Sequence, residues 1–204
     1  MMDLETIFAN YQPKPLGTKR FYAVMIPVIE IAGERVILYE SRAYGISQGG
    51  DTAFPGGRVE KGESFQAAAV RETMEEIGVA REQIQVLGEM DYLVSQGSVV
   101  ACFVANIHIS SLSELMLNED EVAYVFTMPI RELLQQRPEK YMLRGEGKLG
   151  PNFPFDRIPG GKNYPFNRKF RRVIPFYDAG DQSLWGMTAR LTERFIDIIR
   201  EEAI

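Results

Sequence analysis

Residues 57–79, GRVEKGESFQAAAVRETMEEIGV, decide the fold of this 204-residue chain. Mostly apolar side chains recur there at every fourth position, which predicts a helix with one thin apolar stripe. The stripe consists of Phe65, Ala69, Thr73 and Ile77. Residues 54–57 and Gly62 form a glycine-rich loop before the helix, and such a loop allows the backbone to approach a ligand closely.

Three glutamates occupy a second face of this helix. Glu72, Glu75 and Glu76 stand at i, i+3 and i+4, so their carboxylates lie within one turn of each other. Like charges this close repel unless a cation lies between them, and Mg²⁺ and Mn²⁺ take carboxylate oxygens readily. Glu63 lies just before the helix, where the helix dipole favours a negative charge, and Arg71 precedes the cluster. A solvated glutamate-rich helix remains the alternative from these residues alone.

The spacing of the whole stretch decides between these two interpretations. It fits G-x5-E-x7-R-E-U-x-E-E-x-G-U, where U is aliphatic, and only Thr73 departs from the pattern. Seven fixed identities coincide by chance about once in 10⁸ starting positions. The stretch resembles the Nudix box, the signature of the Nudix hydrolases. The resemblance implies an α/β/α sandwich with a mixed β-sheet, in which the box forms a loop–helix–loop.

The resemblance also implies a metal site that holds Mg²⁺ or Mn²⁺. Glu72 and Glu76 would be the main ligands, Glu75 and Glu63 would assist, and the Gly56 carbonyl would be a neutral ligand.

Arg71 would hold Glu63 or neighbouring carboxylates in place rather than touch the substrate. In this family the general base comes from the box or from a later loop, and Glu75 and Glu121 are the residues considered. Glu121 is favoured because Glu121-Val122 matches the family's Glu-Val before the next strand.

A second pattern precedes the box. Residues 41–57 read SRAYGISQGGDTAFPGG, which is similar to the extra signature of the coenzyme A pyrophosphatase branch of the family. This similarity implies that Arg42 contacts a phosphate and that Phe54 borders the substrate. The branch commonly has a His and a Gln where this chain has Gln48 and Asp51. These two departures lie where the substrate is expected to bind, so they bear on the identity of the substrate more than on the type of reaction.

Length and composition predict one soluble domain over residues 1–204, and we expect it in the cytoplasm. No run of 18 apolar residues and no basic-then-apolar leader is present, so no membrane span or signal peptide is expected. Cys102 is the only cysteine and His108 the only histidine. A disulfide within the chain and a multi-thiolate metal site are therefore excluded, and a Ser-His-Asp hydrolase is disfavoured.

The charge of the chain is unevenly distributed. Residues 144–172 carry eight Lys or Arg and two acidic residues, a net charge of +6, and the remaining residues carry −11. Glycine, proline and aromatic residues fill the same segment, which predicts a long loop that closes over the substrate. This loop would bind a phosphate of the substrate through Arg168, Arg171 and Arg172. The alternative is that this segment is a flexible insertion or a subunit contact, and a homodimer is possible. Nucleic-acid binding is disfavoured because the rest of the chain is acidic.

The rest of the chain alternates between strand and helix patterns. Strands are expected at 21–31, 36–39, 53–54, 84–94, 98–109, 122–127 and 173–177. Helices are expected from Pro129 and after Gly186, with Met187, Leu191, Phe195, Ile198 and Ile199 buried in the last one, and residues 1–20 are expected to be an irregular arm.

Three functions remain open from the sequence. The first is hydrolysis of coenzyme A or its derivatives to 3′,5′-ADP and phosphopantetheine. The second is hydrolysis of ADP-ribose, a dinucleotide or another nucleotide conjugate. The third is a non-catalytic Nudix nucleotide-binding module, which the complete glutamate set disfavours.

Overall fold

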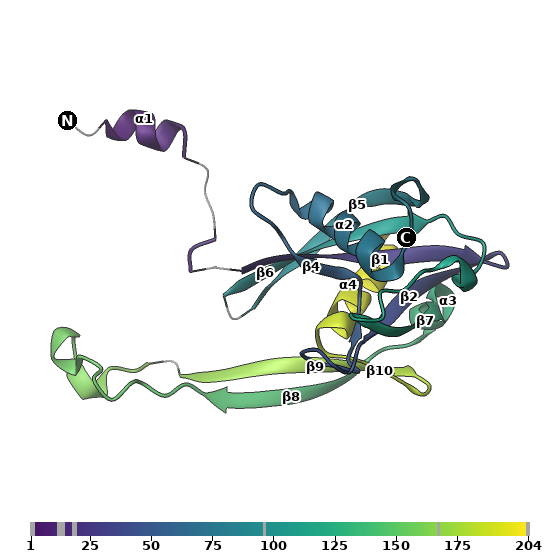
Figure 1. Ribbon diagram of the computed structural model, residues 1–204. Coiled ribbons are helices and arrows are strands. Elements are labelled where there is room, and N and C mark those ends of the chain that lie inside the picture. The colour runs from purple at the N-terminus through teal and green to yellow at the C-terminus, as the bar shows by residue number, and fades with distance from the viewer. Residues whose placement is uncertain (1–2, 12–14, 18–19, 96, 167, 203–204) are drawn as a thin grey trace.

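The computed structural model describes residues 3–11, 15–17, 20–95, 97–166 and 168–202. A mixed β-sheet forms the middle layer (Figure 1). Helix α2 (Phe65–Ile77) packs on one face, and α3 (Ile130–Gln135) and α4 (Gly186–Glu202) pack on the other. The expected α/β sandwich is therefore confirmed.

The sheet has seven strands, and the order β3-β2-β1-β6-β5 forms its main path. Strand β4 also pairs with β1, and β7 pairs with β2. Strands β1 and β6 run parallel, whereas the other pairs are antiparallel. The strands are β1 (Arg20–Ile31), β2 (Glu34–Arg42), β3 (Thr52–Ala53), β4 (Gly56–Arg58), β5 (Ile84–Ser95), β6 (Ser98–Ile107) and β7 (Val122–Pro129).

Strand β1 runs through the centre and is buried on both faces. Its Met25 and Ile29 belong to the apolar cluster that includes α2, and its Val24 and Ile26 belong to the cluster that includes α4. Successive side chains of a strand point to opposite faces, so a continuous apolar strand can join two helical layers.

Helix α2 has a capping residue at each end, Ser64 before its first turn and Gly78 after its last turn. The Ser64 hydroxyl accepts a hydrogen bond from the Ala67 N–H at 3.1 Å, which caps the first turn. Gly78 ends the helix in the left-handed conformation with a φ of 69°. Inside the helix, the Thr73 hydroxyl donates to the Ala69 carbonyl at 2.7 Å, so this departure from the family pattern leaves no unpaired buried hydroxyl.

A second, three-stranded antiparallel sheet has the order β10-β9-β8. Strands β8 (Glu139–Glu146) and β9 (Lys169–Ala179) form a long hairpin, and β10 (Gln182–Trp185) leads into α4. We call residues 139–179 the arm and residues 147–168 its tip. Figure 1 shows the arm running below the sandwich, with the tip extending beyond it.

Several expectations about the chain's periphery were wrong. Only residues 147–168 of the predicted loop 144–172 lie outside strands. Its two ends belong to β8 and β9, and the last predicted strand is longer, because charged residues within β8 and β9 hide the strand pattern. The N-terminal arm contains a short helix, α1 (Leu4–Ala9); residues 1–2, 12–14 and 18–19 of that arm lie outside the described part. Met187 is 50% exposed rather than buried.

The described residues also contain short 3₁₀ helices, which are η1 (Arg81–Gln83), η2 (Leu112–Glu114), η3 (Phe155–Arg157) and η4 (Gly161–Asn163). Within the described residues, the search for a helix of the length and hydrophobicity needed to span a membrane found none.

The end of α2 gives a direct test of this packing. A Cβ atom at Gly78 would lie 2.1 Å from the Met116 carbonyl oxygen, whereas one at Gly180 would meet nothing within 4 Å, although both glycines have a left-handed φ. Gly180→Ala should therefore cost only the backbone strain, about 1 kcal/mol. Gly78→Ala should cost about 3 kcal/mol or more, because backbone must also move. Urea unfolding measures both, and equal losses would contradict the described contact.

Candidate active site

Three glutamates from two elements converge at one end of α2. Glu72 and Glu76 project from the helix, and Glu121 precedes β7. Each offers a carboxylate oxygen, and these oxygens all lie within 4.8 Å of one another. Such a group of oxygens suits a hard divalent cation, and Glu72 and Glu76 are the two residues that the sequence predicts as main ligands.

The helix itself helps to position Glu121. The Asn118 N–H donates to the Glu76 carbonyl at 3.0 Å, and the Glu121 N–H donates to the Asn118 carbonyl at 3.0 Å. On the other side, the Glu121 carbonyl accepts from the Ala43 N–H at 2.8 Å. The free carbonyls at the end of α2 thus anchor the loop that brings Glu121 to the cluster.

Two glycines of β4 allow close approaches beside the site: Gly57 makes room for Glu72, and Gly56 lies against β1. A Cβ atom at Gly57 would lie 2.3 Å from a Glu72 carboxylate oxygen, so only glycine allows the carboxylate to rest against this backbone. A Cβ atom at Gly56 would lie 2.4 Å from the Ala23 carbonyl oxygen. The Gly56 N–H donates to Glu76 Oε2 at 2.7 Å. The predicted role of the Gly56 carbonyl as a ligand stays a prediction.

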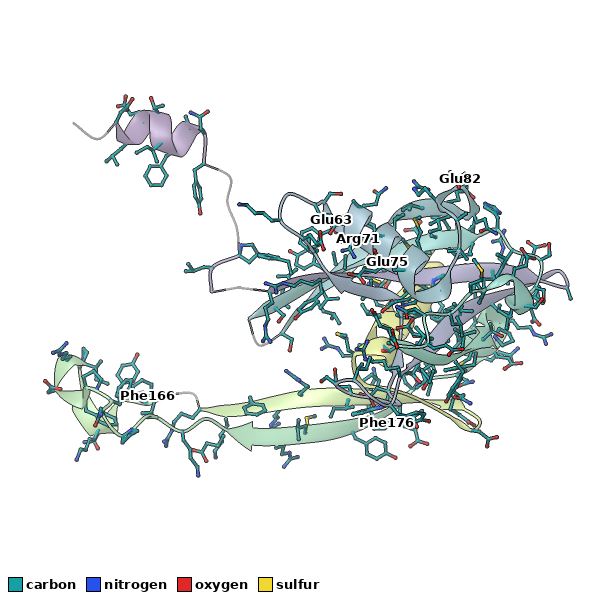
Figure 2. The ribbon with its side chains drawn as sticks, viewed as in Figure 1. Glu63, Arg71, Glu75, Glu82, Phe166 and Phe176 are labelled. Carbon is teal, nitrogen blue, oxygen red and sulfur yellow. The ribbon has the colours of Figure 1, made fainter. Side chains whose placement is uncertain are left out.

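Arg71 joins the loop before α2 to the helix. Its Nε and Nη2 donate to the two oxygens of Glu63 at 2.9 and 3.0 Å. Its Nη1 donates to Glu72 at 2.8 Å and to Glu75 at 3.0 Å. Figure 2 shows Arg71 with Glu63 and Glu75 around it. The hydrogen bonds from Arg71 hold the pKa of Glu63 below its ordinary value, so Glu63 remains charged.

Burial perturbs the inner carboxylates in the opposite direction. Glu76 is 2% exposed. Burial raises the pKa of Glu76 to about 9, and the neighbouring Glu40 carboxylate adds to the rise. Burial also raises the pKa of Glu72. Carboxylates that destabilise one another in this way fit a bound Mg²⁺ or Mn²⁺, because a cation would restore their charged forms.

Glu40 was missed by the sequence analysis. It lies on β2 and is fully buried, and burial raises its pKa. The available signal was one acidic residue directly after the apolar run 36–39.

Two residues predicted to bind the substrate, Arg42 and Phe54, differ in how far they are buried. Arg42 is half-buried at the end of β2, its Nε donates to the Ser47 carbonyl at 3.3 Å, and its positive charge opposes the rise in the pKa of Glu40. It therefore lies on the glutamate side of the sheet, and its phosphate contact stays a prediction. Phe54 is only 4% exposed and stacks on Tyr39 with ring centroids 5.0 Å apart, so its ring belongs to the core.

Arg168, Arg171 and Arg172 lie on the arm, which Figure 1 shows running away from α2. Arg168 faces Glu146 at 3.6 Å, and Arg172 donates to the Ser95 hydroxyl at 3.1 Å. The structure does not bring these arginines to the glutamate cluster of the same chain. Hairpin pairing keeps β8 and β9 extended, which is why the segment does not fold back as the expected loop.

The buried Glu76 predicts how the stability of the metal-free protein depends on pH. The folded state keeps a proton that the unfolded state releases above a pKa of 4.5. This contribution to stability is present below that pKa and is lost as the pH rises through about 9. One retained proton corresponds to a slope of about 1.4 kcal/mol per pH unit.

Urea unfolding in chelator at about pH 6 and about pH 8 should show the loss in the wild type and a smaller loss in Glu76→Gln. Glu82→Gln, an exposed glutamate beyond the helix (Figure 2), should behave as the wild type. An identical slope in all three proteins would contradict the assigned burial of Glu76.

Comparisons with known proteins bear on the family to which this chain belongs. The NUDIX domain model matches residues 19–148. Nudix hydrolase 3 of Caenorhabditis elegans is 32% identical over 145 residues, 67% of this chain and 60% of that protein. An uncharacterized Nudix hydrolase, NudL, of Citrobacter koseri is 31% identical over 192 residues, 91% of this chain and 82% of that protein.

Two further proteins are more distant. The human mitochondrial coenzyme A diphosphatase NUDT8 is 28% identical over 181 residues, 87% of this chain and 68% of that protein. The crystal structure of a MutT/nudix family protein from Enterococcus faecalis gives a TM-score of 0.49 at 16% identity, over 98% of this chain and 70% of that chain. The matched segment contains the glutamate-bearing helix and spans more than half of the sequence, and this chain belongs to the NUDIX domain family.

Proposed function

We propose that this protein is a metal-dependent hydrolase that cleaves the pyrophosphate linkage of a nucleoside diphosphate conjugate, with coenzyme A or a derivative as the substrate. The observation that carries the proposal is the convergence of Glu72, Glu76 and Glu121, whose oxygens lie within 4.8 Å of one another. The relatives cover different shares of this chain, and one of them is matched over only 60% of its length, so the activity rests on the site rather than on names.

The residues of this site have separable tasks. Glu72 and Glu76 would hold the cation, and Glu121 lies at the exposed rim. A divalent cation at such a site neutralises phosphate charge and lowers the pKa of water. Arg71 is a positioning residue, because its hydrogen bonds are already taken up by Glu63, Glu72 and Glu75.

Glu121 is proposed as the group that accepts a proton from the attacking water. It is exposed, whereas Glu76 is buried, so Glu121 can meet both solvent and substrate. A general base must reach the proton that it abstracts directly or through one water. The exposed Glu75 is the alternative within the helix, but its carboxylate is paired with Arg71 at 3.0 Å.

Coenzyme A is favoured over other conjugates by two observations. Residues 41–57 resemble the pattern of the coenzyme A branch, in which an Arg-Ser/Ala pair, here Arg42-Ala43, precedes G-x3-F-P-G-G. The human relative that is 28% identical over 87% of this chain bears the name coenzyme A diphosphatase. Arg42 of this pattern follows Glu40 and Ser41 on β2, and its charge acts on Glu40, which supports the proposal that it binds a substrate phosphate.

A panel of coenzyme A, an acyl-coenzyme A, ADP-ribose and a dinucleoside polyphosphate tests the proposal, with products identified by mass. With Mg²⁺ or Mn²⁺, coenzyme A should give 3′,5′-ADP and phosphopantetheine. Glu72→Gln should lower turnover by roughly 100-fold or more, because one ligand charge is lost. Its melting temperature should change little, since volume and exposure are kept. Glu82→Gln is the control and should keep wild-type turnover.

If ADP-ribose or the dinucleoside polyphosphate is cleaved faster than coenzyme A, coenzyme A is the wrong substrate but the proposed type of reaction stands. A folded wild-type protein that binds Mn²⁺ and cleaves no conjugate would overturn the proposal in favour of a binding module. Wild-type turnover in Glu72→Gln with unchanged metal dependence would show that the metal site is wrongly assigned.

A further inference from the structure

Glu40 is an unusual buried group. It is 0% exposed on the central part of the sheet, and neither of its carboxylate oxygens has a hydrogen-bond partner. Within the described residues, only two other buried side-chain atoms share this condition, the hydroxyls of Ser41 and Tyr177. Buried carboxylates in proteins are normally hydrogen-bonded, paired with a cation or bound to a metal. Glu40 therefore lacks a partner that its surroundings should supply.

The pleat of β2 directs Glu40 towards the glutamate cluster. Val36 and Leu38 of the same strand belong to the apolar cluster on the α2 face, and Ile37 belongs to the cluster on the α4 face. Alternate residues of a strand share a face, so Glu40 follows Val36 and Leu38 to the α2 side. Glu76 of α2 lies on this side of the sheet too, since its Oε2 accepts a hydrogen bond from the Gly56 N–H of β4 at 2.7 Å.

Arginine pairing does not satisfy Glu40. Arg42 lowers its pKa through charge alone, and the Arg42 Nε donates to the Ser47 carbonyl instead. Arg71 is engaged by Glu63, Glu72 and Glu75. Glu121 and Glu72 add further negative charge around it. The described residues thus offer Glu40 no cationic side chain as a hydrogen-bonding partner, and a divalent cation would satisfy both of its oxygens.

We infer that Glu40 is a further carboxylate ligand of the metal centre, forming with Glu76 an inner cation position for Mg²⁺ or Mn²⁺ beneath the exposed Glu121. The inference rests on the proposed function for its cation. It extends the set of ligands beyond the box to the second strand. Glu40 would then remain charged in the loaded protein, and its two free oxygens would be used.

Metal binding by the purified protein tests this inference without any turnover. Isothermal titration with Mn²⁺ and electron paramagnetic resonance of bound Mn²⁺ should show affinity at least tenfold weaker, or one ion fewer, in Glu40→Gln. The metal-free melting temperature should equal or exceed that of the wild type, because an unpaired buried charge has been removed. The rise in melting temperature on adding Mn²⁺ should shrink. Glu30→Gln, an exposed glutamate of β1, is the matched control.

Unchanged Mn²⁺ affinity and stoichiometry in a folded Glu40→Gln would overturn the inference and leave the proposed function intact. Should Glu40→Gln fail to fold, Glu40→Asp serves instead, because it keeps the charge but withdraws the carboxylate by one methylene. Unchanged affinity in Glu40→Asp would equally overturn it. A wild-type protein that binds Mn²⁺ through Glu40 but cleaves no conjugate would overturn the proposed function alone.

The arm carries a second, independent inference. Its base is attached to the sandwich, since Lys140 pairs with Glu193 at 2.7 Å. Its tip stands clear of the sandwich in Figure 1, yet aromatic rings pack on one another there. The ring centroids of Phe153 and Phe155 lie 5.0 Å apart, and those of Phe153 and Phe166 lie 5.3 Å apart. The tip is therefore a small folded unit at the end of a two-stranded hairpin.

Large exposed apolar side chains lie on both faces of this hairpin, and one face carries three of them together with Arg172. The register pairs Gly145 with Phe170, so Tyr141, Leu143 and Phe170 point to the same side. They are 57%, 46% and 53% exposed. A hairpin of two strands is marginally stable alone, and an exposed apolar stripe marks an interaction site.

The charges identify the partner. Residues 144–172 carry a net charge of +6 against −11 for the remaining residues, and the tip lies away from its own sandwich. The geometry points to a second copy of this chain as the partner, with the arm of each copy on the acidic sandwich of the other. Opposite potentials favour and orient such contacts.

Sedimentation velocity of the full chain tests this contact. The wild type should be a dimer whose dissociation constant rises with salt. Replacing residues 147–168 by Asn-Gly should give a monomer; a two-residue turn fits because the flanking residues Glu146 and Lys169 are paired in the hairpin. Phe170→Glu should weaken the dimer at least tenfold, whereas Leu87→Glu, an equally exposed apolar residue on β5, should not. A monomeric wild type, or variants that dimerise as tightly, would overturn the inference.

Discussion

The mutual repulsion of crowded carboxylates is the constraint on which the rest of the site depends. Glu76 is 2% exposed and Glu40 is fully buried, and burial raises the pKa of each. The backbone of β4 lies close to these groups, since Gly57 leaves room for the Glu72 carboxylate and the Gly56 N–H donates to Glu76. A divalent cation would relieve the repulsion between the carboxylates, so this arrangement favours the binding of positive charge.

Arg71 sets the boundary of this negative region. It bonds Glu63 on the loop, Glu75 on the helix and one oxygen of Glu72. Glu63 and Glu75 are thus balanced by Arg71, while Glu76 and the other oxygen of Glu72 are left for a cation. The end of α2 completes the arrangement, since its last carbonyls hold the loop that carries Glu121. A single helix thus provides ligands along its side and anchors a further acidic residue at its end.

The sequence was sufficient for the fold and for the helix that carries the site. The spacing of residues in the box predicts helix α2 and the glutamates that it carries. Strands β1 and β6 are apolar enough to be recognised as strands. The arm was not recognised because β8 and β9 contain charged residues that break alternation. Glu40 could not be found because its importance comes from the pairing and pleat of β2, which turn it to the α2 side of the sheet. Phe54 was assigned to the substrate, but the pairing of β3 with β2 brings its ring onto Tyr39.

The central claim is that carboxylates from α2 and from the strands beside it hold one metal centre. A crystal of the protein soaked in Mn²⁺ measures this directly through the anomalous scattering of manganese. The account predicts a peak within coordination distance, about 2.2 Å, of carboxylate oxygens of Glu72 and Glu76. A saturated crystal whose only manganese peaks lie away from these two residues would contradict it.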